Sequence, residues 1–281
     1  MINVTSPRDI TLLLKENGLS PLKKFGQNFL CDENIVNKIA DSVELTENDY
    51  VLEIGTGLGA LTRALARRAK KVVSVEIDTG LIALHAATLG DLENVTVIEG
   101  DVLKCDLGEI CRTHFHGSSF HVCGNLPYYI TSKILMTLLE DSAPILSITA
   151  MVQKEVAQRL SAQPGDTDYS ALTASCLYYG KPETLFEVSR NCFYPAPDVD
   201  SAIIRFALGE PACDAARRDY VRVVRAAFSM RRKTLFNNLK ALGDADTVIT
   251  ILKNCNIDPK TRAQCLSPAE FCSLAKAFFQ K

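Results

Sequence analysis

The stretch that decides the fold is Tyr50-Val51-Leu52-Glu53-Ile54-Gly55-Thr56-Gly57-Leu58-Gly59-Ala60. Its first five residues form a nearly continuous apolar run, which predicts a strand buried on both faces. The glycines that follow let the backbone turn tightly and approach a ligand, and residues 60–69 predict a helix. A strand, a glycine turn and a helix in this order are typical of the first unit of a doubly wound α/β sheet.

Outward from this stretch, short apolar runs alternate with helical segments as far as Arg205. The alternation predicts a parallel, doubly wound, Rossmann-like sheet. Further strands are expected at 71–76, 94–99, 119–124 and 145–152, and a closing pair at 183–188 and 201–207.

The chain divides into three predicted parts. Residues 1–46 are an N-terminal extension with a helical run at 34–43, and residues 47–208 are the sheet domain. Strand patterns stop at Gly209-Glu210-Pro211, so residues 209–281 predict a small helical domain. Its helical runs are 214–242, 246–255 and 267–279.

Composition indicates a globular protein, because 47% of the 281 residues are hydrophobic and 23% are charged. The first ten residues lack the basic region and apolar run of an export signal. The longest apolar stretch, 144–152, is far shorter than the ~20 residues that span a bilayer. These features predict a cytoplasmic protein with no membrane partner.

Ten cysteines are scattered along the chain, and no pair has C-x-x-C spacing. With no export signal, they are expected to be reduced thiols. The densest group of metal-ligating residue types has spacings that fit no usual zinc geometry, so no metal site is expected. That group is Cys111, His114, His116, His121 and Cys123.

The net charge of −2 conceals two parts of opposite sign. Residues 207–281 carry 13 Lys and Arg against 7 Asp and Glu, a net charge of +6, whereas the first 206 residues carry −8. A basic C-terminal part on an acidic body suggests an anionic partner.

The glycine turn predicts a cofactor site at Gly55 and Gly57, although this pattern also fits dinucleotide-binding proteins. Glu53 lies two residues before Gly55, where a pyrophosphate would gain nothing from negative charge. Glu76 ends the second strand and can accept hydrogen bonds from ribose, and Asp101 ends the third and can accept one from an adenine amine. A cationic cofactor with ribose and adenine but no phosphate is S-adenosylmethionine.

Asn125-Leu126-Pro127-Tyr128 follows the fourth strand and should face the ligand crevice. The exocyclic amine of adenine is a poor nucleophile because its lone pair is delocalised into the ring. The Asn125 side-chain oxygen and the Leu126 carbonyl can both accept its protons and localise that lone pair. Pro127 holds the carbonyl, and Tyr128 offers a ring on which the base can stack.

A target base must leave its helix to reach such a pocket. The stiff loop Phe193 to Ser201, between the last two strands, suggests Phe193 as a second stacking surface. A core anchor is the alternative role for Phe193.

A basic run predicts a surface that binds the phosphates of a nucleic acid: residues 217–233 carry 7 positive side chains and 1 negative one. If 217–239 is one helix, Arg218, Arg222, Arg225 and Arg232 lie within one stripe. A break at Ser229 would splay this stripe. The predicted RNA contacts are Arg218, Arg222, Arg225, Arg231, Arg232 and Lys233.

These motifs together resemble the KsgA (RsmA) small-subunit rRNA adenine dimethyltransferases, which are related to the Erm methylases. The resemblance implies that Asn28, Leu30 and Val102 join Gly55, Glu76, Asp101 and Asn125 around the cofactor. It also implies dimethylation of N6 of two adjacent adenosines in the 3′-terminal hairpin loop of small-subunit rRNA, in the immature ribosomal subunit. One departure is Met230, which stands where bacterial members often have Gln. The matching stretches are residues 24–30, 53–62, 75–78, 100–102, 124–130, 193–201 and 227–235.

Two other classes share parts of this pattern. A DNA adenine or protein glutamine methyltransferase has an Asn-x-Pro-Tyr motif, but has no need for both the Phe193 loop and the basic run. A non-catalytic assembly or transcription factor on the same fold need not keep Glu76 and an intact Asn125 motif. We therefore expect a monomeric, cytoplasmic rRNA adenine dimethyltransferase of ribosome biogenesis.

Overall fold

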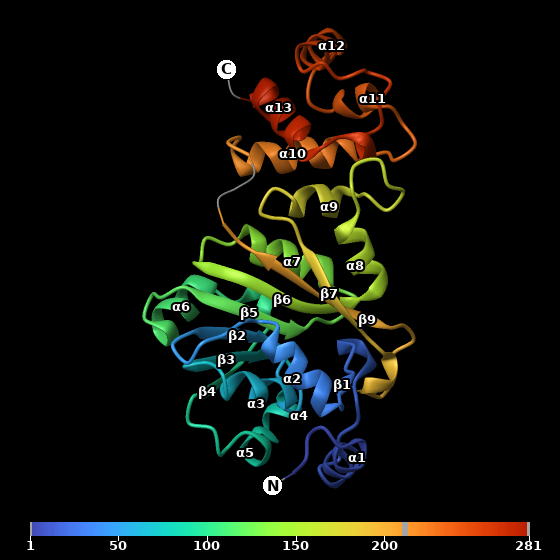
Figure 1. Cartoon of the computed structure of the whole chain (residues 1–281). Helices are drawn as coiled ribbons and strands as arrows, with labels where there is room; N and C mark the ends of the chain where they lie inside the picture. Colours follow the sequence, from blue (N-terminus) through green and yellow to red (C-terminus); the bar gives the residue numbers. More distant parts are fainter. Residues whose placement is uncertain (1, 210–212, 280–281) are drawn as a thin grey trace. The chain divides into compact units, whose positions relative to one another are not determined.

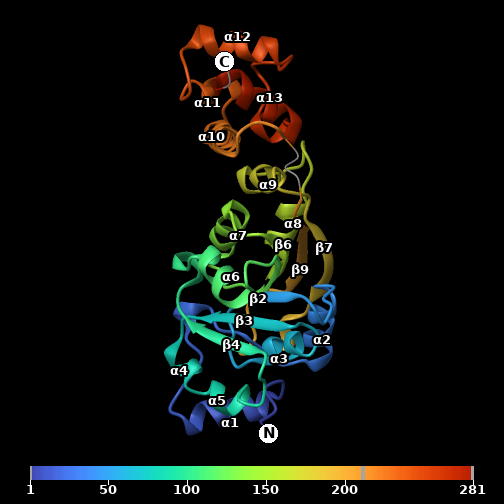
Figure 2. The same ribbon diagram turned by 90° about the vertical axis from the view of Figure 1, so that its left-hand side faces the viewer.

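The computed structural model describes residues 2–209 and 213–279 of the chain, which form two compact units. The first unit comprises residues up to Ala157 together with Glu183–Leu208, and the second comprises Gln158–Pro182 and the residues from Gly209 onward. Each unit is described by itself below (Figures 1 and 2). In the described residues, no helix has both the length and the apolar character needed to cross a bilayer.

A seven-stranded sheet forms the centre of the first unit, in the order β4-β3-β2-β5-β6-β9-β7. The pairs among β4, β3, β2, β5 and β6 are all parallel, whereas β9 pairs antiparallel with both β6 and β7. The predicted doubly wound sheet and its closing pair are thus confirmed. The strands are β2 (Tyr50–Ile54), β3 (Lys71–Glu76), β4 (Val95–Glu99), β5 (Phe120–Asn125), β6 (Ile145–Gln153), β7 (Glu183–Val188) and β9 (Ser201–Ala207).

Helices cover both faces of this sheet, and its central strands are accordingly almost fully buried. All five residues of β2 are buried. Val51 packs in a core cluster with residues of α2 and α3, whereas the Tyr50 ring, on the opposite face, lies 5.2 Å from the ring of Phe115 in α6. The helices of this unit are α1 (Pro7–Glu16), α2 (Glu33–Asp41), α3 (Ala60–Ala66), α4 (Thr79–Ile82), α5 (His85–Thr88), α6 (Leu107–Phe115) and α7 (Thr131–Glu140).

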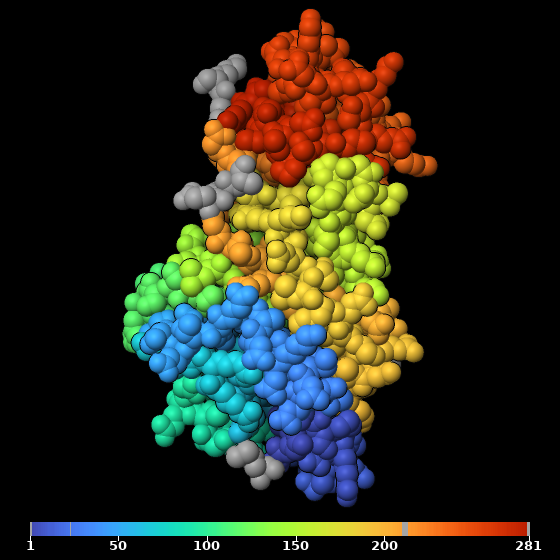
Figure 3. All heavy atoms as spheres, viewed as in Figure 1, coloured from blue at the N-terminus to red at the C-terminus, as the bar shows by residue number. Residues whose placement is uncertain are grey.

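A two-stranded sheet ties the N-terminal extension to the loop before β9. In it, β1 (Phe29–Leu30) pairs antiparallel with β8 (Phe193–Tyr194). The pairing continues as the Cys31 amide donates a 2.8 Å hydrogen bond to the Cys192 carbonyl. Figure 3 shows the blue N-terminal region beside the yellow-to-orange segment that contains β8. The extension is therefore part of the sheet unit.

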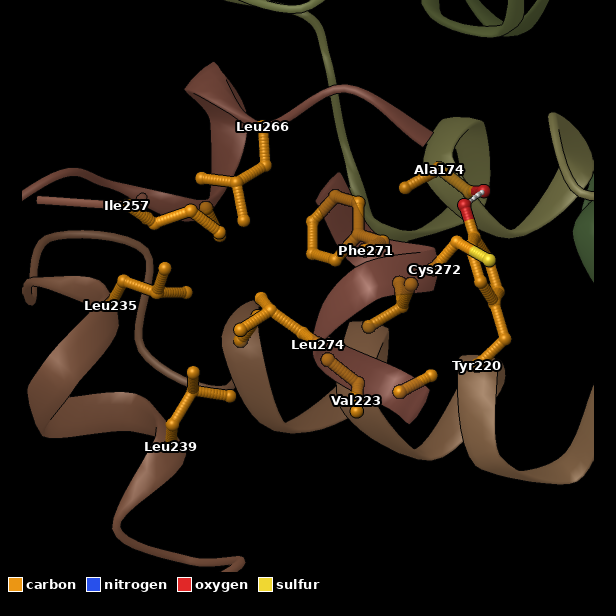
Figure 4. Packing of buried hydrophobic residues seen from close by; sticks show 14 of the residues in the cluster. Ala174, Tyr220, Val223, Leu235, Leu239, Ile257, Leu266, Phe271, Cys272 and Leu274 are labelled. Atoms are coloured by element: carbon orange, nitrogen blue, oxygen red, sulfur yellow. Dashed lines mark hydrogen bonds between the residues drawn. The ribbon is translucent and has the colours of Figure 1, made fainter. Parts of the chain in front are cut away.

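The second unit is helical, as predicted, but it contains residues 158–182, which the predicted boundary assigned to the sheet domain. This prediction was wrong because the segment's aromatic and small side chains pack with those of the C-terminal helices. The Tyr220 hydroxyl donates a 2.9 Å hydrogen bond to the Ala174 carbonyl in that core (Figure 4). Part of the predicted boundary at Gly209-Glu210-Pro211 lies outside the described residues. The helices here are α9 (Ala171–Cys176), α10 (Arg217–Ala227), α11 (Leu235–Leu239), α12 (Ala245–Asn254) and α13 (Pro268–Phe279), with α8 (Lys154–Ser161) at the boundary.

The basic run is not one helix. Helix α10 ends at Ala227, and α11 begins after Thr234, whose side chain caps it by accepting from the Asn237 amide. The residues between the two helices include Arg231, Arg232 and Lys233. The predicted four-arginine stripe is therefore wrong for Arg232, since α10 ends at Ala227 and Arg232 lies beyond it.

Cys213 and Cys272 form a disulfide that joins the start of the second unit's main segment to α13. The expectation of reduced thiols was wrong for this pair, whose partners are 59 residues apart in sequence. The eight other cysteines are free.

Candidate active site

A cavity of 290 Å³ opens at the carboxyl ends of the parallel strands in the first unit. Open α/β sheets bind ligands at this edge, because loops from neighbouring strands converge there. Of the predicted cofactor and catalytic residues, ten line this one cavity: Asn28, Gly55, Gly57, Glu76, Asp101, Val102, Asn125, Leu126, Pro127 and Tyr128.

The glycine turn forms one wall of the cavity. Gly55 has φ +80° and Gly57 has φ +56°, a backbone conformation that favours glycine. A Cβ on Gly57 would lie 3.5 Å from the Phe29 ring, so a side chain there would also fill space beside the cavity. The buried His85 braces the turn, because its Nε2 lies 2.9 Å from the Gly57 carbonyl oxygen.

Glu76 is held rigidly at the end of β3. Its Oε2 accepts a 2.8 Å hydrogen bond from the Gly57 amide, and its Oε1 accepts 2.9 Å bonds from the Ile77 and Asp78 amides. A carboxylate offers about four acceptor positions, so one remains for a ligand in the cavity. This arrangement fits recognition of a ribose hydroxyl.

Asp101 occupies the equivalent place after β4. Its Oδ1 accepts a 3.0 Å hydrogen bond from the Leu103 amide and so caps the short turn that carries Val102. Its Oδ2 lies 4.0 Å from the exposed ammonium group of Lys104. One carboxylate oxygen therefore remains able to accept from an amine in the cavity.

Asn125 ends β5 with its side-chain amide fixed by the N-terminal extension. Its Nδ2 donates a 3.1 Å hydrogen bond to the Asn28 carbonyl. Its Oδ1 and the Leu126 carbonyl accept no hydrogen bond from the described parts of the chain. Two neighbouring acceptors at the cavity are thus available to the protons of a bound amine.

The rest of the motif is held by the sheet and the following helix. The Pro127 carbonyl accepts from the Ile130 amide at 3.2 Å and from the Thr131 hydroxyl at 3.0 Å. The Tyr128 hydroxyl lies 2.6 Å from the Ser201 hydroxyl of β9. Burial raises the pKa of Tyr128, so this phenol stays neutral, and its contact with Ser201 holds the ring.

Asn28 is brought over the cavity by its neighbours in the extension. Gln27 Nε2 donates a 2.6 Å hydrogen bond to Asp78, and Gln27 Oε1 accepts one of 2.7 Å from the Leu22 amide. Asn28 itself donates to the Gly26 carbonyl at 3.0 Å. The β1–β8 pairing then anchors the chain immediately after Asn28.

Leu30 and Phe193 do not line the cavity. They face each other across β1 and β8, and both are buried in the same core cluster, with Phe193 only 4% exposed. The expectation of a stacking surface at Phe193 is therefore not met in this structure, because strand pairing turns its ring into the core. The core-anchor role, which the sequence left open, is the one that the structure shows.

Glu53 is also inside the protein, not in the cavity. Its side chain is fully buried, and its Oε2 accepts a 2.6 Å hydrogen bond from the Thr62 hydroxyl. Burial raises the pKa of Glu53 to about 8. The inference that negative charge at Glu53 disfavours a pyrophosphate therefore does not hold, because burial favours the neutral form of this carboxyl.

Apolar residues that were not predicted from the sequence complete the cavity: Phe25, Phe29, Ile77, Leu81, Leu103, Tyr129, Ile130 and Ile134. Five of them lie within two residues of a predicted site residue, so adjacency in the sequence could have found them: Phe29, Ile77, Leu103, Tyr129 and Ile130.

The predicted RNA-contact residues all lie in the second unit and are exposed. Arg222 lies over the Phe279 ring at 4.6 Å, and Arg231 donates to the Thr167 carbonyl. The other four form no ion pair within residues 2–209 and 213–279: Arg218, Arg225, Arg232 and Lys233.

The densest group of metal-ligating types that the sequence contains is used for other bonds. Cys111 Sγ lies 3.3 Å from the Ser118 carbonyl oxygen, and His121 Nδ1 lies 2.8 Å from the Ser147 hydroxyl. Among the residues that the structure describes, one group of potential ligands is close enough for a metal, Cys213, Asp214 and Cys272, but the two sulfurs there are bonded to each other.

The residues present fit S-adenosylmethionine. Strand-end acids have free acceptors for ribose and adenine, the glycine turn leaves room for the cofactor chain, and Ile77, Val102 and Leu103 provide apolar contacts for a flat ring. The fold and the site together define a Rossmann-like S-adenosylmethionine-dependent methyltransferase.

The chain belongs to the ribosomal RNA adenine dimethylase family, whose profile matches residues 20–280. Ribosomal RNA small subunit methyltransferase A of Pelotomaculum thermopropionicum is 43% identical over 289 residues, which cover 99% of this chain and 98% of that protein. The protein of the same name from Anoxybacillus flavithermus is 42% identical over 285 residues, or 99% and 97% of the two chains.

Solved structures agree with this assignment. A dimethyladenosine transferase from Plasmodium falciparum superposes with a TM-score of 0.74 at 26% identity, covering 86% of this chain and 94% of that one. The 23S rRNA methyltransferase ErmE superposes with a TM-score of 0.69 at 30% identity, covering 90% and 100%. The resemblance that the sequence motifs suggested is confirmed.

Proposed function

We propose that this enzyme transfers two methyl groups to N6 of each of two adjacent adenosines in the 3′-terminal hairpin loop of small-subunit rRNA, during ribosome biogenesis. Membership of the adenine dimethylase family and the small-subunit relatives support this substrate. The observation that carries the proposal is the pair of open acceptors at Asn125 Oδ1 and the Leu126 carbonyl.

The chemistry follows from these two acceptors. When each accepts a hydrogen bond from the adenine amine, the nitrogen moves toward tetrahedral geometry and its lone pair is localised, while both N–H bonds remain intact. Bound S-adenosylmethionine supplies the electrophilic methyl group. The Asn28 carbonyl fixes the Asn125 amide with its oxygen available, and Pro127 and Tyr128 hold the base in line. The methylated ammonium can lose its proton to water, so no general base is required.

The finer points of the proposal rest on chemistry and charge. The exposed basic residues Arg218, Arg222, Arg225, Arg231, Arg232 and Lys233 are proposed to contact phosphates of the RNA. The enzyme is proposed to act as a monomer in the cytoplasm, where small subunits are assembled. A disulfide is unusual in that compartment, which makes the Cys213–Cys272 pair a direct subject for experiment.

The test is to incubate the protein with methyl-labelled S-adenosylmethionine and small subunits that lack these methyl groups, and then to map the label. We expect label on two adjacent adenosines of the 3′-terminal hairpin, and labelling at least ~100-fold slower with the Asn125→Ala variant. Transfer to DNA or to protein glutamine, or binding without transfer, would contradict the proposal.

A further inference from the structure

Tyr129 is an exposed aromatic residue at the mouth of the cavity. It lines the cavity, yet 61% of its surface is exposed, more than that of any other large hydrophobic residue described. Its neighbour Tyr128 is turned inward, with its hydroxyl against Ser201. Of the two consecutive tyrosines, Tyr128 therefore lies inside the cavity and Tyr129 lies at its entrance.

The Tyr129 ring lies beside the backbone of Gly26. Gly26 has φ +63°, and a Cβ built there would lie 3.7 Å from Tyr129 Cδ1 and 4.0 Å from Pro127 Cβ. The Tyr129 hydroxyl makes no hydrogen bond with the described portion of the chain. The ring thus lies beside the Gly26 backbone, and its hydroxyl does not hold it in place.

The surroundings of Tyr129 are cationic and aromatic. Phe25 also lines the cavity, and the exposed Lys24 ammonium group lies 4.6 Å from the centre of its ring. The cavity's acids, Glu76 and Asp101, follow β3 and β4, on the other side of β2 from β5. We call Lys24, Phe25, Gly26 and Tyr129 the entrance rim. A base with its phosphate fits this rim, because aromatic rings stack on bases and lysine neutralises phosphate.

We propose that Tyr129 binds, by stacking, the nucleobase adjoining the target adenosine, so that one adenosine of the pair lies on the entrance rim while the other is in the cavity. This inference rests on the proposed function, because it needs a target base in the cavity. It assigns the rim to the second base of the substrate and makes Tyr129 a substrate-binding residue that orients the RNA backbone at the cavity entrance.

The test is a double-mutant cycle on enzyme and RNA. Small subunits are assembled with rRNA whose 3′-terminal fragment is synthetic and ligated, so that either adenosine of the pair can be replaced by an abasic site. Methylation of the remaining adenosine is then measured as kcat/KM for the wild type, Tyr129→Ala and Tyr129→Phe. Leu146→Ala, at an exposed position of β6, is the matched control for losing an exposed hydrophobic residue.

On intact RNA we expect Tyr129→Ala to lose about 5- to 150-fold in kcat/KM, the range for one stacked base. The wild type should lose the same factor with an abasic neighbour, and Tyr129→Ala should then lose nothing further. Since the rim lies on one side of the cavity, this coupling is expected for one of the two abasic placements. Tyr129→Phe and Leu146→Ala should behave like the wild type.

Four results would overturn the inference. Losses that multiply for both placements would show that Tyr129 does not contact the neighbouring base. Wild-type kcat/KM in Tyr129→Ala, or a loss of cofactor affinity by calorimetry, would remove it from RNA binding. The fourth is that Tyr129→Ala lowers kcat/KM on assembled subunits without lowering affinity for the hairpin RNA alone. That result would show that Tyr129 contacts a ribosomal protein and not the neighbouring base. Failure of the proposed function is distinct, because the wild type would then methylate no adenosine of the pair.

Discussion

Asn125 shows how one residue is fixed at one end and left reactive at the other. Its Nδ2 is bonded to the Asn28 carbonyl, whereas its Oδ1 has no partner in the described residues and lies at the cavity with the Leu126 carbonyl. The residue is thus placed before any substrate arrives, which is the arrangement that lowers a barrier most effectively.

Asn125→Ala should lower methyl transfer by at least ~100-fold, because it removes an acceptor that acts mainly in the transition state. Binding to small subunits should be retained. Single-turnover kinetics with saturating cofactor measures the chemical step, and circular dichroism confirms folding. If turnover survives, Asn125 is only the end of a strand and the amine is activated elsewhere.

Glu53 gives a pH prediction of definite sign. Burial raises the pKa of this carboxyl from 4.5 to about 8. Its contribution to stability is therefore complete below about pH 4.5 and is lost as the pH rises through 8. Glu53→Gln, which cannot ionise, should gain roughly 3–5 kcal/mol relative to the wild type between pH 5 and pH 9.

Urea unfolding at pH 5, 7 and 9 measures this difference. Asp91→Asn is a suitable comparison. The bond to Arg63 lowers the pKa of the exposed Asp91 to about 2, so this carboxyl stays ionised from pH 5 to pH 9. Parallel stability profiles for Glu53→Gln and the wild type would show that Glu53 is ionised in the folded protein.

At the scale of elements, the strands were predictable because most of them are apolar runs with clear ends. The predicted bounds of β2, β3, β7 and β9 agree with the structure residue for residue. The cofactor acids were predictable for the same reason, since parallel strands bring their carboxyl ends to one edge. The sequence cannot show which way a short strand turns its side chains, and so it left open whether Phe193 is a stacking surface or a core anchor.

Long-range pairings also escaped prediction. Residues 158–182 join the helical unit through contacts such as Tyr220 with Ala174, 46 residues apart in the chain. The Cys213–Cys272 disulfide is of the same kind, because no local pattern marks two cysteines that approach each other only when α10 and α13 pack.

Removing this disulfide should destabilise the helical unit. For a bond that closes a loop of this length, reduction or a Cys213→Ser/Cys272→Ser double variant should cost about 2–4 kcal/mol of unfolding free energy. Urea unfolding with and without reductant measures it, with Cys265→Ser, at an exposed free cysteine, as the control. Equal stability in both conditions would show that the helices hold the unit without the bond.

At the scale of the whole molecule, charge separates the two units. Residues 158–182 carry two positive and two negative side chains, so the reassignment of this segment leaves the helical unit at +6. The cavity lies in the acidic sheet unit, and the six predicted RNA contacts lie in the basic one. Methyl transfer and general RNA affinity should therefore respond to different mutations.

The loop between α10 and α11 tests this division. Arg231, Arg232 and Lys233 are exposed there, and the structure shows that they follow the end of α10. If all three neutralise phosphates, replacing them with Ala should lower the slope of log affinity against log salt by roughly 2–3 units. Affinity for unrelated RNA should fall in parallel, because phosphate contacts position RNA without reading its sequence.

The control is cofactor affinity, which should stay at the wild-type value because the cavity belongs to the other unit. The competing explanation is that these side chains only solvate a loop, which predicts an unchanged salt slope and at most a small shift in Tm.

Arg231 donates to the Thr167 carbonyl, so the Arg232→Ala/Lys233→Ala double variant, which keeps that bond, is tested separately. If this double variant binds small subunits with the wild-type salt slope, the loop is no RNA surface. Phosphate contacts would then have to come from Arg218, Arg222 and Arg225 on α10, since these are the other predicted contacts of the basic run.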